Sequence, residues 1–385
     1  MTDNAKYLNY NWSWPKCFTQ SVPMGYPFFL KVLGSFDPLL NSLPYIQTAI
    51  ILCSIYFLFC TMRKSGYGAK LAFWISAPLL LAPNLLINFY GCNPECFSGV
   101  GAILIVALII KAQRDKRWRT YMALGLVVFL TYQMRVIMVS LIPLVLLFCR
   151  DRRAWIAMTL PFIAFCLLRF AVVNDFAICS DGGIQSVGYF MPFFTQVDIP
   201  KVDPEVRDLA QAVVNHKSPW REDILPRKSD RWFYLMWKAR DEYEAFLWPI
   251  LGAKRNNDVV VNKKLKKLAF EAIRLHPLKY IELVTRGFLV AIQHWPDPIA
   301  TFLLVFSNVG IAFRKRFLPV RYYEETDRRW VFFCLIGFAY FFINVLMLVS
   351  VTGPDDRYLH LCYLFIPSIL ISSLYQNWPK KVYSL

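Results

Sequence analysis

Residues 330–350 read WVFFCLIGFAYFFINVLMLVS, a run of 21 positions without a charged side chain. A helix of this length rises about 30 Å, which matches the hydrocarbon core of a bilayer. The whole chain of 385 residues is 57% hydrophobic and only 18% charged, whereas an ordinary soluble domain is roughly 25% charged. The sequence therefore predicts a membrane protein and excludes disordered, collagenous and small disulfide-stabilised folds.

The same apolar pattern recurs along the chain and predicts an all-α fold, a polytopic transmembrane helical bundle of about nine spans. The apolar segments are 44–62, 71–90, 97–110, 120–133, 136–149, 154–173, 298–313, 330–350 and 359–376. The two on either side of Arg135 are short, since about 14 residues make only ~21 Å of helix. We expect these two helices to meet inside the membrane.

Basic residues lie on alternate connections between the apolar segments. Five connections carry 19 Lys and Arg residues against five Asp and Glu residues, a net charge of +14 out of +17 for the chain. They are 63–70, 111–119, 150–153, 314–329 and the tail after residue 376. The positive-inside rule assigns such connections to the cytoplasm. Because the membrane accounts for this charge, no nucleic-acid partner is expected.

The other connections, 1–43, 91–96, 174–297 and 351–358, then share the opposite face of the membrane and can build one site. The long loop 174–297 is predicted to fold into helices. One begins at Asp203-Pro204, because Asp is a favoured N-cap and Pro suits the first helical position.

A second helix of this loop is predicted over 263–276, and a third begins at Pro277 and is expected to lie at the membrane interface. The chain is thus divided into three parts. These are a membrane region 1–173 with six spans, an extracytoplasmic helical loop 174–297, and a membrane region 298–385 with three spans.

Three outer segments carry polar residues in a recurring arrangement. The first reads MTDNAKYLNY and then SVPMGYPFFLKVLGSF, the second NFYGCNPECFSG, and the last VTGPDDRYLHLCYLFIP. Together with the segment EAIRLHPLKYIELVTRGF, this ensemble resembles the GT-C superfamily of polytopic glycosyltransferases that use polyprenyl-phosphate-linked sugars. It is most similar to the bacterial branch that modifies proteins and lipid A.

The resemblance implies a hexosyl- or pentosyl-transferring glycosyltransferase of a bacterial inner (plasma) membrane, with its active site facing the periplasm. The donor is a polyprenyl-phosphate sugar, and the acceptor is a lipid, a glycan or a protein. By position in the motifs, Asp3 is expected to be the general base or a ligand of a divalent cation. Glu95 is expected to be its partner in either role.

A lipid phosphate is the leaving group of such a transfer, so a fixed cation must hold the developing negative charge. Arg357 is the first candidate for this contact and Arg135 the second. His360 follows Arg357 by three positions and is predicted on the same helix face. Asp356 is expected to orient Arg357, and Tyr26 to support the site.

Each candidate also has a structural interpretation, which the sequence leaves open. Arg135 and Arg357 could instead anchor the protein at the membrane interface. Glu95 and Asp356 could instead cap the helices that follow them. Asp3 is alternatively a solvated residue. Likewise, His360 is alternatively a structural histidine and Tyr26 part of an interfacial aromatic belt. The alternative functions are a transporter or flippase for a lipid-linked sugar and a polymerase of surface polysaccharide.

Residues 1–43 are predicted outside the cytoplasm, but no apolar stretch before residue 44 is long enough to carry them across. Members of the resembled superfamily have a span immediately before the acidic residue that Asp3 matches. We therefore expect a further span upstream of Met1.

Overall fold

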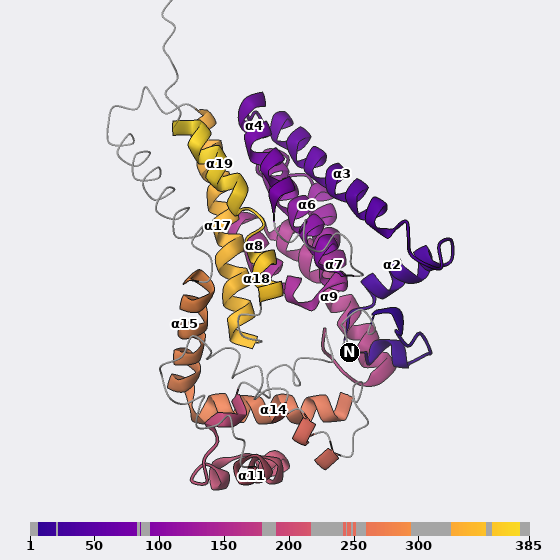
Figure 1. Ribbon diagram of the computed structural model, residues 1–385, viewed down its shortest axis with the longest axis vertical. Coiled ribbons are helices and arrows are strands. Elements are labelled where there is room, and N and C mark those ends of the chain that lie inside the picture. Colours follow the sequence, from indigo (N-terminus) through magenta and orange to yellow (C-terminus); the bar gives the residue numbers. More distant parts are fainter. Residues whose placement is uncertain are drawn as a thin grey trace, which may run out of the picture.

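The computed structural model contains helices and no strands in the part of the chain that it describes (Figure 1). That part comprises residues 7–20, 22–82, 85, 93–178, 190–216, 242, 243, 245–247, 249–251, 259–293, 325–351 and 356–377. Five helical stretches in it are long and apolar enough to cross a membrane. They are α3 (Leu43–Lys64), α6 (Glu95–Arg114), α9 (Arg152–Val173), residues 327–351 of α17 (Glu325–Val351), and residues 359–376 across α18 (Asp356–Cys362) and α19 (Ile366–Asn377). The all-helical membrane architecture is confirmed in these terms, and the count of nine spans is not.

Two predicted spans are interrupted. The segment 71–90 is described only as α4 (Ala69–Ser76) followed by the 3-10 helix η2 (Ala77–Leu81), where Pro78 has no backbone N–H with which to continue the α-helix. The last apolar segment breaks into α18 and α19, with a turn at 363–365 before Pro367. The predicted span 298–313 lies outside the described residues.

Helix α6 is the centre of the bundle, and 89% of its apolar 18-residue stretch is buried inside the protein. It lies between α3 and α7 (Trp118–Met134), and α7 in turn packs on α9. Gly101 of α6 lies against Thr131, and Gly125 of α7 against the backbone of Ala157 in α9, so neither position has room for a side chain. Small residues at these crossings let the helix backbones approach closely, as in other membrane bundles.

The described parts of four basic connections meet at one end of the bundle, which we call the basic end. Arg114 donates to the carbonyl of Lys64, and Gln113 Nε2 donates to the carbonyl of Phe148 at 2.8 Å. Tyr67 donates its hydroxyl to the carbonyl of Arg329 at 3.0 Å. Segments that the charge pattern assigns to the cytoplasm are therefore neighbours in space.

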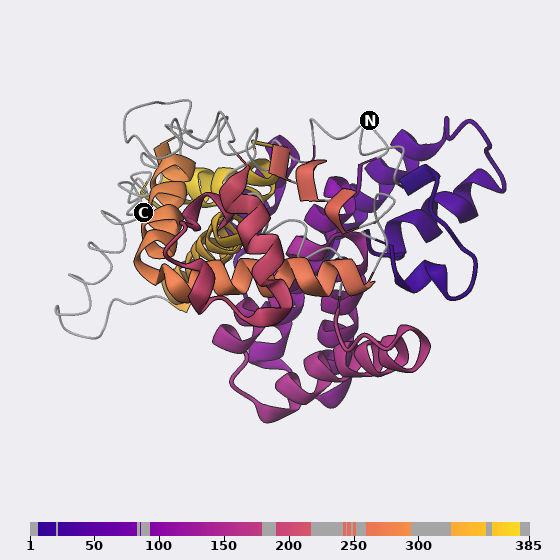
Figure 2. The same ribbon diagram turned by 90° about the horizontal axis from the view of Figure 1, so that it is seen from below.

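The long loop forms a second apolar cluster beyond the other end of the bundle. It contains η6 (Pro204–Val206), α11 (Arg207–Asn215), α14 (Val259–Leu275) and α15 (Pro277–Gln293). Figure 1 and Figure 2 show α14 lying across this end, with α11 on the side of α14 that faces away from the bundle. The helices predicted after Asp203, over 263–276 and from Pro277 are confirmed, although the first begins as a 3-10 turn capped by the Asp203 carboxylate.

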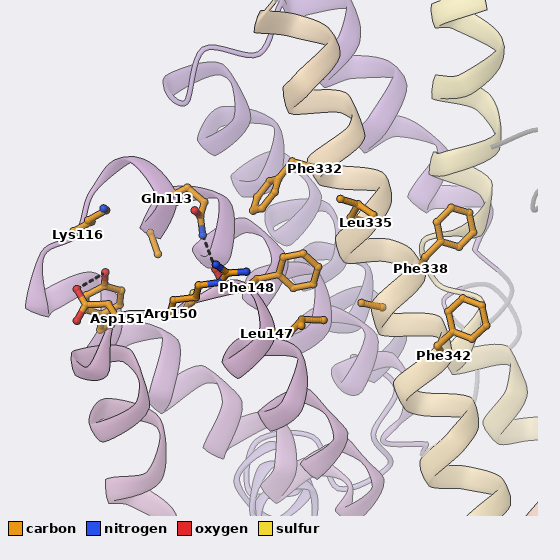
Figure 3. A pocket seen from close by; sticks show the side chains of 14 residues that line it. Gln113, Lys116, Leu147, Phe148, Arg150, Asp151, Phe332, Leu335, Phe338 and Phe342 are labelled. Carbon is orange, nitrogen blue, oxygen red and sulfur yellow. Dashed lines mark hydrogen bonds between the residues drawn. The ribbon is translucent and has the colours of Figure 1, made fainter. Parts of the chain in front are cut away.

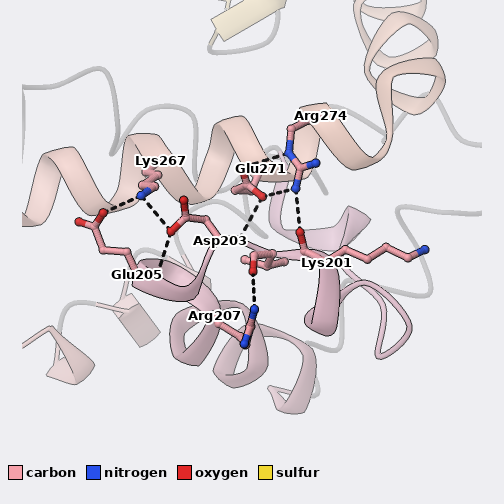
Figure 4. Close-up of polar contacts among 8 residues, drawn as sticks. Lys201, Asp203, Glu205, Arg207, Lys267, Glu271 and Arg274 are labelled. Carbon is pink, nitrogen blue, oxygen red and sulfur yellow. Dashed lines mark hydrogen bonds and ion pairs between the residues drawn. The ribbon is translucent and has the colours of Figure 1, made fainter.

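Ion pairs fasten α14 to the segment before α11 (Figure 4). Lys267 lies 2.9 Å from Asp203 and 2.6 Å from Glu205, while Arg274 donates to Glu271 at 2.6 Å and to the carbonyl of Lys201 at 2.8 Å. The hydrogen bond from Lys267 holds the pKa of Asp203 below its ordinary value. These contacts fix α14 relative to the segment 201–205 of the same loop.

Helix α15 packs along α17, so its axis follows the bundle instead of crossing its end. Ala291 of α15 is fully buried with Phe341 and Val345 of α17, and the Tyr363 hydroxyl donates to the carbonyl of Ala291 at 2.5 Å. In Figure 1, α15 runs beside the lower part of α17 while α14 crosses below. The amphipathic helix that lies across the bundle end is therefore α14.

The membrane orientation gives a first testable prediction. Asp208 on α11 of the long loop and Arg119 on the first turn of α7, next to the basic end, are both exposed. With cysteine at either position, an impermeant maleimide is expected to label Asp208→Cys in intact cells, and Arg119→Cys only after permeabilisation. Labelling of both from the same side would contradict the orientation. The unsubstituted chain supplies the background from its own cysteines.

Candidate functional site

Glu95 and Arg135, which the sequence singles out separately, form an ion pair inside the protein. The Nη1 atom of Arg135 contacts Oε1 of Glu95, and the two residues are only 8% and 3% exposed. A buried charge of either sign is costly alone, so each side chain supplies the counter-charge that offsets the burial of the other. The pair lies at the end of the bundle opposite the basic end, which we call the site end.

Local sequence explains how both side chains reach this point. Glu95 is the first residue of α6, directly after Pro94, so its negative charge lies at the positive end of the helix dipole. Arg135 ends α7 in an extended conformation, with φ −156° and ψ 130°, and the 3-10 helix η3 (Val136–Ser140) follows before α8 (Leu141–Phe148). The predicted break at Arg135 is confirmed, and it turns the guanidinium toward α6.

Helix α2 (Gly25–Gly34) closes this end from the side of the first loop. A Cβ atom on Gly25 would lie 2.7 Å from the carbonyl oxygen of Gln133, so glycine permits the close contact with the end of α7. Tyr26 is fully buried, with its ring 5.2 Å from the ring of Tyr7 and 5.8 Å from that of Phe97. Tyr26 is thus a core residue of the site end and not part of an exposed aromatic belt.

Three buried side chains of this region have polar atoms without a hydrogen-bond partner among the described residues. They are Oε2 of Glu95, Oε1 of Gln133, and both amide atoms of Gln47 in α3, one turn beyond Leu43. Leu43 shares the cluster of Tyr26 and Phe97. Buried polar atoms are nearly always paired, so these atoms make the region around the ion pair a candidate polar site.

The predicted phosphate-binding segment reaches the same region of the bundle. Helix α18, which carries Asp356, Arg357 and His360, packs against α6 and α17. His360 is half-buried, whereas the side chains of Asp356 and Arg357 lie outside the described residues. Residue Asp3 also lies outside them. The structure therefore brings Glu95, Arg135 and Tyr26 together at the site end. Helix α18, which carries Arg357, contacts the same helix α6.

The described side chains do not by themselves make a divalent-cation site. They include no group of three His, Cys, Asp or Glu residues close enough to share a metal ion. Glu95 offers one free oxygen, but the guanidinium of Arg135 beside it would repel a cation. What the arrangement can do is accept a hydrogen bond or a proton at Oε2 while Arg135 fixes the carboxylate.

Sequence reasoning missed a second buried ion pair. Arg169, near the end of α9, lies 2.7 Å from Asp175, and both are almost fully buried. Lys263 of α14 donates to the carbonyl of Asn174 at 2.9 Å, next to this pair. An arginine inside an apolar segment is the signal that could have found it, because such residues are rarely unpaired. The pair attaches the long loop to the bundle.

Comparison of the chain with protein-family models, with curated proteins and with solved structures gives no match.

Proposed function

We propose that the protein is a membrane glycosyltransferase that moves a sugar from a polyprenyl-phosphate carrier to an acceptor outside the cytoplasm. The observation that carries the proposal is the buried Glu95–Arg135 pair with a free carboxylate oxygen. It lies where the first loop meets the start of α6, and α18 of the last motif-bearing segment packs against α6 and α17. The motifs of these segments, which resemble those of the GT-C superfamily, supply the reaction class.

The reaction needs a base for the acceptor hydroxyl. As the acceptor oxygen bonds to the anomeric carbon, its proton passes to a carboxylate, and the bond from that carbon to the carrier phosphate breaks. We assign the base to Asp3, with Glu95 as its partner. The assignment is compatible with chain length, because four residues span at most about 14 Å and Tyr7 packs on Tyr26 beside Phe97.

The arginines divide two tasks in this proposal. Arg135, which the sequence offered for the phosphate, is instead the positioning partner of Glu95, because its guanidinium contacts that carboxylate. Arg357 on α18 holds the departing phosphate, for which a planar guanidinium gives two parallel hydrogen bonds. His360, three positions later on α18, is a further candidate for this contact. The long loop covers the site end and selects the acceptor.

Substitution of Arg357 tests the proposal. The assay measures release of the carrier phosphate in proteoliposomes supplied with a polyprenyl-phosphate sugar and envelope lipid extract. Arg357→Lys is expected to lower this release at least tenfold, since lysine keeps the charge but lacks the planar guanidinium that forms two parallel hydrogen bonds. Arg357→Ala is expected to lower it about 100-fold or more.

Arg153→Lys, an exposed exchange of the same kind at the basic end, is the matched control and should leave the rate unchanged. Wild-type release by Arg357→Ala would contradict the phosphate role. Absence of carrier release by the wild-type protein with any sugar-loaded carrier would contradict the function itself.

A further inference from the structure

A cleft of about 1190 Å³ opens at the basic end, far from Glu95 (Figure 3). Helix α6 carries Glu95 on its first turn and the cleft residue Ala112 near its last, about 26 Å further along the axis. One wall of the cleft is α17 and the other is the end of α8 with the connection that follows it. The cleft is therefore separate from the site end.

The α17 wall is an apolar strip. It consists of Phe332, Leu335, Phe338 and Phe342, spaced three, three and four residues apart, which places them on one helix face. Ten residues of helix rise about 15 Å, which is half of a hydrocarbon core of roughly 30 Å. Leu147 and Phe148 face the strip from α8 (Figure 3). The strip thus has the length of one leaflet.

The mouth of the cleft at the basic end is polar and carries net positive charge. Lys116 and Arg150 line it, are exposed, and form no ion pair with any described residue. Among the described lining residues the one carboxylate is Asp151, which accepts from the backbone N–H of Arg153 at 2.9 Å and from the Tyr121 hydroxyl at 3.1 Å. Lys116 and Arg150 together outweigh this carboxylate, so the charged lining residues carry a net charge of +1, which favours an anion.

A second cleft of about 670 Å³ adjoins the first and shares Gln113 and Phe332 with it. Its charged lining residues are four cations, Lys64, Arg114, Arg328 and Arg329, and one carboxylate, Glu325, which pairs with Arg329. The polar mouth is thus surrounded by cations on the side away from the apolar strip. This separation of charge from apolar surface is the pattern that a lipid with an anionic headgroup requires.

We propose that the cleft binds an anionic phospholipid of the cytoplasmic leaflet, with its acyl chains along α17 and its phosphate between Lys116 and Arg150. The volume exceeds the roughly 300–1,000 Å³ of small-molecule sites. The proposal uses the charge pattern and the cleft and does not depend on the glycosyl-transfer reaction.

Native mass spectrometry of the full chain released from bilayers with equal amounts of phosphatidylglycerol and phosphatidylcholine tests the headgroup contact. The wild type should retain phosphatidylglycerol preferentially. The double variant Lys116→Gln, Arg150→Gln should lower this preference about 30-fold, since each of the two cations near the surface contributes about 1 kcal/mol and about 1.4 kcal/mol is tenfold in affinity.

The matched control is Arg119→Gln with Arg152→Gln, which removes the same charge from the basic end without touching the cleft. It should retain the wild-type preference. No preference in the wild type, or an equal loss in the control, would overturn the proposal.

A second pair of variants tests the apolar strip. Leu335 and Leu346 are 51% and 52% exposed on α17, but only Leu335 lines the cleft. Leu335→Trp should fill the cleft and lower lipid retention several-fold, whereas Leu346→Trp should not. Equal retention by both variants would contradict binding along α17.

Photo-crosslinking identifies the occupant directly. Benzoylphenylalanine in place of Phe338 keeps an aromatic ring in the strip and should attach to phospholipid. Attachment instead to residues 298–313 of the same chain, or to a second copy, would overturn the proposal.

Discussion

Arg135→Met is expected to destabilise the protein by about 3–5 kcal/mol, because it leaves the buried carboxylate of Glu95 without its counter-charge. The measurement is denaturant unfolding in mixed micelles, relative to the wild type. Arg135→Met combined with Glu95→Leu removes both charges and should regain most of the loss, since apolar residues of similar volume replace buried ion pairs well.

The double-mutant cycle separates the interaction free energy of the two charges from the effect of changing the volume of each side chain. Arg286→Met is the control, because Arg286 pairs with Glu282 on the exposed face of α15 and such pairs contribute less than about 1 kcal/mol. If the double variant were no more stable than Arg135→Met alone, the two residues would not act as a pair.

Glu95→Gln is expected to have the larger effect on activity. The amide keeps the size of the side chain and still accepts a hydrogen bond from Arg135, but it cannot hold a proton or support a neighbouring base. Loss of a positioned acid–base group typically costs 10²–10⁴-fold in rate. Carrier release in proteoliposomes should fall by about that factor, while binding of the donor changes less.

Glu282→Gln makes the matched comparison, since Glu282 also pairs with an arginine but is half-exposed. This variant should turn over at the wild-type rate. A Glu95→Gln protein that turns over normally would leave the ion pair as a purely structural contact.

Local sequence features were enough to predict several elements. Proline at the first helical position and Asp203 as a cap located helices of the long loop, and Pro277 is the first residue of α15. The break at Arg135 follows from two apolar segments that are each too short to cross a bilayer. Basic residues on alternate connections predicted neighbours at one end, and the contacts of Arg114, Gln113 and Tyr67 bear this out.

Long-range packing could not be predicted in the same way. Glu95 and Arg135 lie 40 residues apart, and only the packing of α6 against α7 brings them together. Arg169 went unnoticed within the apolar segment 154–173, because the hydropathy of a segment is an average over many residues and a single charge changes it little. The burial of Tyr26 likewise depends on the glycine at position 25, whose lack of a side chain lets α2 approach α7.

The most direct measurement is the mass spectrum of envelope glycolipids and glycans from cells that lack the gene and express either the wild-type chain or Glu95→Gln. The wild type is expected to restore a species heavier by one sugar residue, and Glu95→Gln is expected to lack it while the sugar-loaded polyprenyl phosphate accumulates. The same heavier species in both strains, or no sugar-dependent difference between either strain and the deletion, would contradict a glycosyl transfer that depends on the buried pair.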